Sequence, residues 1–233
     1  MKAKNEVATI EKTETLPMVA ADNRGFEEPI DQGDLMIPRA KLLQPVSEEL
    51  KDPTSTLRQG QVINSLTKEV LPCLFTPIFH YKEFMRFNPR KKDDLGWDEK
   101  YAPGALIWKT RDINDPRVKE CDFGPNGETP LAITTLNFFC VFEGQPMPII
   151  ITFSKSSYKT GRLLLSLTKF RGGAMFRGKY ALTVTPGKSD KGSYFILNVA
   201  AKGDCTPDEF KLAESYHTMY GSKRDSIETH IED

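Results

Sequence analysis

Cationic and aromatic side chains are interleaved over residues 145–189, a stretch that contains no aspartate or glutamate. Cations attract phosphate groups, and ring faces stack on nucleobases, so this combination predicts binding to single-stranded nucleic acid. We expect the contact residues of this stretch to be Lys155, Tyr158, Lys159, Arg162, Lys169, Phe170, Arg171, Phe176, Arg177 and Lys179.

A short repeat lies near the middle of this stretch. Phe170-Arg171-Gly172 and Phe176-Arg177-Gly178 each combine a ring, a cation and a flexible backbone position. Each ring could stack on a base while its arginine meets a phosphate. In the alternative interpretation, both rings pack into the core and the arginines are solvated.

The charge of the chain is unevenly distributed, although its 32 basic and 32 acidic residues cancel overall. Residues 1–34 carry four cations and eight anions, and residues 204–233 carry three cations and eight anions. A basic centre therefore lies between acidic ends. Solvated surfaces and disordered tails are the ordinary explanation of such charge runs.

A second group of cations and rings precedes this stretch. Arg86, Arg90 and Trp97 belong to a region rich in Phe, Tyr, Lys and Arg between residues 84 and 101. We expect these three side chains to extend the nucleic-acid contact. The acids of the same region, among them Asp98 and Glu99, weaken that interpretation.

Signals for catalysis are weak. Residues 173–179 match GxxxxGK, but Tyr180 stands where a nucleotide-binding loop needs a Ser or Thr hydroxyl for magnesium. The four cysteines lack the spacing of a zinc site. We expect no enzyme activity, no metal and no cofactor. A metal-dependent nuclease using Asp98 or Glu99 is the least favoured alternative.

Local patterns predict mainly β structure with two helices. Thr206 and Glu209 have capping-box spacing, with Pro207 at the first helical position, which predicts a C-terminal helix ending at Gly221. We expect strands at residues 61–66, 71–87, 105–109, 131–142, 148–153, 179–185 and 193–200, and helices at 158–170 and 207–220.

The order of these elements places the basic helix between the third and fourth main strands, as in an OB-fold barrel. With its charge, its aromatic residues and the run ITFSKSSYKTGRLLLSL, the chain resembles phage-encoded single-stranded-DNA-binding proteins of the OB type over about residues 61–203. The resemblance implies an OB-like antiparallel barrel that coats single strands without sequence specificity during replication or recombination. It also implies an acidic C-terminal tail that competes for the basic groove or recruits partners.

The chain is expected to form one OB-like nucleic-acid-binding domain at residues 35–221. Flexible acidic segments flank it at residues 1–34 and 222–233. No membrane span or signal peptide is recognised, which predicts a protein of the (host) cytoplasm. DNA and RNA both remain open as ligands, as does a homo-oligomeric state. A structural or inhibitor protein that binds an acidic partner is the main alternative function.

Overall fold

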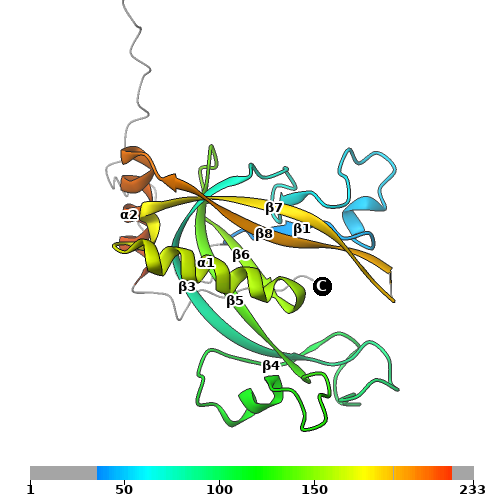
Figure 1. Ribbon diagram of the computed structural model, residues 1–233. Coiled ribbons are helices and arrows are strands. Elements are labelled where there is room, and N and C mark those ends of the chain that lie inside the picture. Colours follow the sequence, from blue (N-terminus) through cyan, green and yellow to red (C-terminus); the bar gives the residue numbers. More distant parts are fainter. Residues whose placement is uncertain (1–35, 191, 222–233) are drawn as a thin grey trace, which may run out of the picture. The chain divides into compact units, whose positions relative to one another are not determined.

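The computed structural model describes residues 36–190 and 192–221, so the predicted segments 1–34 and 222–233 lie outside the described residues. Figure 1 shows the elements. The main strands are β3 (Leu74–Phe87), β4 (Leu106–Thr110), β5 (Ala132–Phe142), β6 (Ile149–Ser154), β7 (Gly178–Ser189) and β8 (Gly192–Asp204). Two short strands, β1 (Ala40–Leu42) and β2 (Val62–Asn64), pair with each other. The two α-helices are α1 (Tyr158–Arg171) and α2 (Pro207–Tyr220).

The main sheet is antiparallel, with strand order β6-β5-β3-β7-β8 and with β4 paired to the end of β3. The predicted mainly β class is therefore confirmed. The basic helix follows β6, and the C-terminal helix begins at the predicted capping box, in which the Thr206 N–H donates to Glu209 Oε2 at 2.8 Å.

The sheet is not closed into a barrel, in contrast to the predicted OB-like architecture. Its two outer strands, β6 and β8, do not pair in the described part of the chain. The segment before and after β1 contacts both of them instead. The Ile150 N–H donates to the Pro38 carbonyl at 2.9 Å, and the Gln44 side chain exchanges two hydrogen bonds with the backbone of Phe195. These contacts occupy the edges that barrel closure would need.

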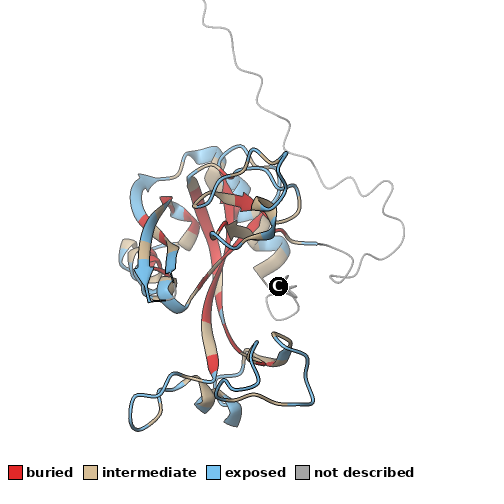
Figure 2. Cartoon of the chain, turned by 90° about the vertical axis from the view of Figure 1, so that its right-hand side faces the viewer, coloured by how far each residue is buried: buried red, intermediate tan, exposed pale blue. Residues whose placement is uncertain are grey.

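The helix α1 packs on one face of this sheet, against β5, β6 and β8. Leu164 enters a core that includes Leu136, Phe138 and Phe153, all of which are buried. Gly161 lets the helix approach closely: a Cβ placed there would lie 2.7 Å from the Cβ of Phe153. Figure 2 shows how the buried residues concentrate in the long central strands.

We expect Gly161→Ala to lower the free energy of unfolding by about 1–2 kcal/mol. Alanine gains about 1 kcal/mol of helix propensity, but overpacking typically costs about 1–3 kcal/mol. We expect a cost of about 2–3 kcal/mol here, because the added methyl group overlaps the Cβ of Phe153, which cannot move aside as a side-chain tip would. Urea denaturation monitored by circular dichroism measures the difference. Ser166→Ala on the exposed side of the same helix is the control, with an expected change within about 0.5 kcal/mol. A Gly161→Ala variant as stable as the wild type would contradict this packing.

The opposite face of the sheet carries a second core and a row of polar side chains. Phe79, Phe139 and Ile150 pack there with Phe210 and other residues of α2. The polar row lies farther along the same face and crosses three strands. Asn137 of β5 is paired with Tyr81 of β3 on one side and with Thr152 of β6 on the other.

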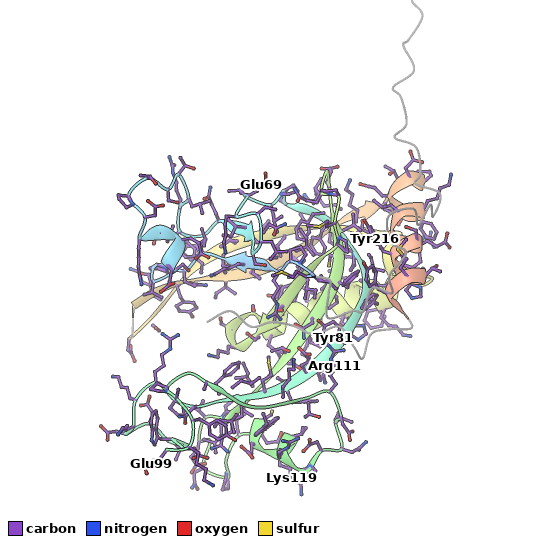
Figure 3. All side chains as sticks on the ribbon, turned by 180° about the vertical axis from the view of Figure 1, so that it is seen from behind. Glu69, Tyr81, Glu99, Arg111, Lys119 and Tyr216 are labelled. Carbon is purple, nitrogen blue, oxygen red and sulfur yellow. The ribbon has the colours of Figure 1, made fainter. Side chains whose placement is uncertain are left out.

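Glu83 is the charged centre of this row, and its side chain is fully buried. It accepts from Arg111 Nε at 3.0 Å and from Asn137 Nδ2 at 3.0 Å. The Arg111 guanidinium also lies over the Tyr81 ring, 4.1 Å from its centroid, as Figure 3 allows the reader to follow. Burial, followed by the nearby charge of Glu83, raises the pKa of Tyr81 well above its ordinary value. The row is thus an ordered buried network rather than a solvated surface.

The strands β3 and β7 are joined over a short distance. Their register contains only two pairs, Leu74 with Ala181 and Phe75 with Tyr180. In contrast, β7 and β8 pair along nearly their whole length. The rings of Phe75 and Tyr180 add a side-chain contact at this junction, with centroids 6.0 Å apart.

Candidate nucleic-acid interface

The basic helix is introduced by a tight turn after β6. The short 3₁₀ helix η4 (Lys155–Ser157) connects the two elements, and the Ser157 hydroxyl accepts from the Ser154 N–H at 3.1 Å. The helix ends at Gly172, whose φ of 75° belongs to the left-handed region that glycine tolerates. Both ends of α1 are therefore defined by local sequence.

One side of this helical segment presents a row of cations to solvent. Lys159, Arg162 and Lys169 are exposed at helical spacings that keep them on the side opposite the buried Leu164, and Lys155, also exposed, lies in η4 just before the helix. None of these four side chains forms an ion pair with any described residue. We call this row the α1 cation row. It is available for anions from solvent.

Phe170 lies at the C-terminal end of the α1 cation row. Its side chain is 88% exposed, the highest value among the exposed large hydrophobic residues of the described chain. Two residues farther along the chain are Gly172 and Gly173, which carry no side chain. The space beside Gly172 is empty, since a Cβ there would meet no heavy atom within 4 Å. The ring is placed to stack on a partner from solvent. Tyr158, at the start of the helix, is half-buried and packs against the core.

Phe176, the second ring of the repeat, has the opposite environment. It is 7% exposed and packs beneath α2, with its ring centroid 4.9 Å from that of Phe210 and 5.7 Å from that of His217. The two Phe-Arg-Gly triplets are therefore not equivalent, and Phe176 belongs to the core. We do not include its covered ring in the contact surface.

The arginines of the two triplets converge on one carboxylate. Arg171 Nη1 donates to Asp204 Oδ1, and Arg177 Nη2 lies 3.8 Å from Asp204 Oδ2. Desolvation lowers the pKa of Arg171, but the hydrogen bond to Asp204 and the proximity of Tyr180 outweigh that effect, and the pKa lies above its ordinary value. Arg171 is therefore charged at neutral pH.

Lys179 is also held by carboxylates. Its Nζ lies 2.6 Å from Glu209 Oε1 and 2.9 Å from Glu143 Oε1. The hydrogen bonds to Glu209 and Glu143 raise the pKa of Lys179. Its side chain is only 16% exposed, so Lys179 fastens α2 to the β5–β6 turn.

The second predicted group lies at the end of β3 and in the loop before β4, apart from α1 in Figure 1. Arg86 bonds to Glu120 at 2.8 Å and to the Gly96 carbonyl at 3.1 Å, which ties two loops together. Trp97 is half-buried, whereas Arg90 is exposed. Of these three predicted contact residues, only Arg90 presents a fully accessible cation.

Sequence reasoning missed the three carboxylates that neutralise the second half of the basic stretch, Asp204, Glu143 and Glu209. The predicted hairpin did not indicate Asp204, because strands at 179–185 and 193–200 would pair Thr185 with Ser193 and carry Asp204 past Arg177. In the structure the strands are longer and Thr185 pairs with Ile196. This register brings Gly178 opposite Asp204, with a one-residue shift at a bulge between Lys179 and Tyr180. Asp204 thus lies beside Arg177.

Comparison with models of protein families shows to which family the chain belongs. The model of the family described as Pam3 phage gp34-like protein matches residues 4–225, nearly the whole chain. The chain belongs to this family. The match supports the phage origin implied by the resemblance in sequence. No curated protein and no solved structure matches the chain.

Residues 173–179, which match GxxxxGK, do not lead into the helix that follows a nucleotide-binding loop. After Gly173 the chain forms a short 3₁₀ helix (Met175–Arg177) and then enters β7, as expected from its sequence. Within residues 36–190 and 192–221, no three His, Cys, Asp or Glu side chains gather as a metal site. No helix in this part of the chain is long and apolar enough to cross a membrane.

We expect Phe170→Ala to weaken binding to oligo-dT by about 1–3 kcal/mol, the usual range for one stacked base. Because the ring is 88% exposed, the free energy of unfolding should change by less than about 0.5 kcal/mol. Fluorescence anisotropy measures the affinity, and thermal unfolding measures the stability. Phe123→Ala, which removes a ring that is 73% exposed in the β4–β5 connection, is the matched control and should leave the affinity unchanged. Equal affinities of the Phe170→Ala variant and the wild type would remove this ring from the interface.

Proposed function

We propose that the protein binds single-stranded DNA without sequence preference, through the α1 cation row and Phe170, and that it serves phage replication or recombination without catalysis. The observation that carries this proposal is the α1 cation row itself, with three exposed cations on one side of α1, a fourth in η4 just before it, and a highly exposed ring at its end. Such a surface combines phosphate attraction with a stacking platform.

The chemistry of this surface favours a single strand over a duplex. Phosphate contacts alone would serve both, but a protruding ring finds a free base face only where bases are not paired and stacked with neighbours. The surrounding backbone carries glycines rather than bulky side chains at Gly172 and Gly173, so a base can approach the ring. Sequence preference is not expected, because every base has a ring face.

The acidic segments 1–34 and 222–233 complete the proposal. Their excess of carboxylates suits contacts with basic replication or recombination proteins. Both segments lie outside the described residues, and their role in recruitment stays a prediction from the sequence, as does homo-oligomerisation.

Titration of the full-length protein into fluorescently labelled oligo-dT tests the function. Anisotropy is followed at several salt concentrations, with a duplex and an RNA strand of matched length as competitors. If the four cations of the row each meet one phosphate, log K should fall with log salt with a slope of about −3, since single strands give about −0.7 per phosphate.

Tight, salt-dependent binding that the duplex does not displace is the expected result. Displacement by RNA as efficient as by DNA would extend the ligand to both nucleic acids. Absence of binding at low salt would contradict the proposal and would leave the α1 cation row to be explained by an acidic protein partner.

A further inference from the structure

Asp204 lies in β8, outside the basic stretch in sequence, but its exposed carboxylate is paired with two arginines of that stretch. Its side chain is 55% exposed, and so is that of Arg177, whereas that of Arg171 is 22% exposed. Each carboxylate oxygen faces a different guanidinium: Oδ1 is bonded to Arg171 and Oδ2 lies 3.8 Å from Arg177. The carboxylate therefore sits between two cations and remains open to solvent.

The backbone holds this arrangement in place. Gly178 is paired with Asp204 across β7 and β8, and the Cys205 N–H donates to the Arg177 carbonyl at 3.0 Å. Gly178 also leaves room for the Arg171 side chain, since a Cβ there would lie 2.9 Å from Arg171 Nε. The two guanidiniums are thus oriented toward a common point before any ligand arrives.

A phosphodiester presents the same kind of acceptor as a carboxylate, a singly charged group with two oxygens that guanidinium groups bind well. Arg171 directly follows Phe170 in the last turn of α1, so the exposed ring and the arginine pair lie at the same end of the helix. We propose that Arg171 and Arg177 form a phosphate-binding pair, which Asp204 occupies in the free protein and which a phosphate of the bound strand takes over. This inference rests on the proposed function, and it identifies Asp204 as a residue that limits the affinity of the surface for the strand.

The exchange has a thermodynamic consequence. A strand must displace the carboxylate from two arginines before its phosphate can use them, so Asp204 lowers the affinity of the protein for nucleic acid. The effect is that of losing an exposed ion pair, which corresponds to a factor of about three to five in affinity. An acidic residue within the contact surface would then set the strength of binding.

The variant Asp204→Asn tests this role, because it keeps the shape of the side chain and removes its charge. We expect it to bind oligo-dT about three- to fivefold more tightly than the wild type at low salt. We expect its salt slope to match that of the wild type, because the phosphate of the strand contacts the arginine pair in both complexes. Asp122→Asn, which removes an exposed carboxylate after β4, is the matched control and should leave the affinity unchanged.

A second substitution assigns the effect to the arginine pair. Arg177→Gln should weaken binding more in the Asp204→Asn background than in the wild type, because Asp204 no longer competes for that guanidinium. Thermal unfolding of each variant verifies its fold, and Asp204→Ser replaces Asp204→Asn if the latter is unstable.

The outcomes separate this inference from the function on which it rests. If the wild type binds oligo-dT and Asp204→Asn binds no more tightly, the role of Asp204 is overturned while the function stands. If only Asp204→Asn binds, the inhibitory role is supported in its strongest form. If neither binds, both proposals are overturned.

Discussion

Replacing Lys159, Arg162 and Lys169 together by glutamine is expected to weaken binding to oligo-dT roughly 100-fold at low salt. The estimate assigns about 1 kcal/mol to each lost phosphate contact. This value is slightly below the usual net contribution of a hydrogen bond to a charged group, about 1.5–3 kcal/mol. All three side chains are exposed and make no ion pair with a described residue, so their removal should not disturb the fold.

The salt dependence of this triple variant is the more specific readout. Losing three phosphate contacts should make the slope of log K against log salt shallower by about 2. The control replaces Lys82, Lys119 and Lys211, three exposed lysines outside α1, and so changes the net charge equally. If both triple variants lose affinity to the same extent, only the overall charge matters and the α1 cation row is not the interface.

The largest effect on stability is expected at Glu83. We expect Glu83→Gln to lower the free energy of unfolding by about 3–5 kcal/mol, the usual range for removing one partner of a buried ion pair. The side chain is fully buried and accepts from Arg111 and Asn137, so an amide would remove the buried carboxylate charge to which Arg111 Nε is bonded. Urea denaturation measures the loss.

A double replacement distinguishes the ion pair from packing. Glu83→Met with Arg111→Met removes both charges at once, and should be less destabilising than Glu83→Gln alone, because the cation bonded to Glu83 is removed together with the carboxylate. Glu99→Gln, at an exposed position in the loop before β4 that Figure 3 labels, is the control, with an expected change within about 0.5 kcal/mol. A fully stable Glu83→Gln variant would show that the charge contributes nothing to the network.

Elements with strong local signals were predictable from the sequence. The capping box of Thr206 and Glu209 placed α2 correctly, and the apolar run at 71–87 marked β3. The open sheet was not predictable. It depends on the segment around β1, which has mixed local character, and on a side-chain contact between Gln44 and Phe195, residues 151 positions apart. Contacts of that separation leave no periodic trace in a sequence.

The candidate site shows the same division. The helix predicted at 158–170 contains Lys159, Arg162 and Lys169, and the structure places all three on one side of it. Periodicity could not separate Phe170 from Phe176, because each ring is followed by Arg-Gly, and α2, which covers the second ring, is distant in sequence. Nor could a charge count over residues 145–189 reveal that carboxylates from outside this stretch neutralise Arg171 and Lys179.

The short pairing of β3 with β7 has a consequence for motion within the sheet. With a ladder of only two residue pairs, the sheet consists of two leaves, β6-β5-β3 and β7-β8, joined at a narrow seam. Such a seam opens at a lower free energy than either leaf unfolds, because few backbone hydrogen bonds must break. The helix α1 contacts both leaves, through β5 and β6 on one side and β8 on the other, and so limits their relative movement. A nucleic-acid strand bound along α1 would therefore also hinder opening between β3 and β7. Slower amide exchange near Phe75 and Tyr180 would then report binding, although these residues lie on the side of the helix away from the nucleic acid.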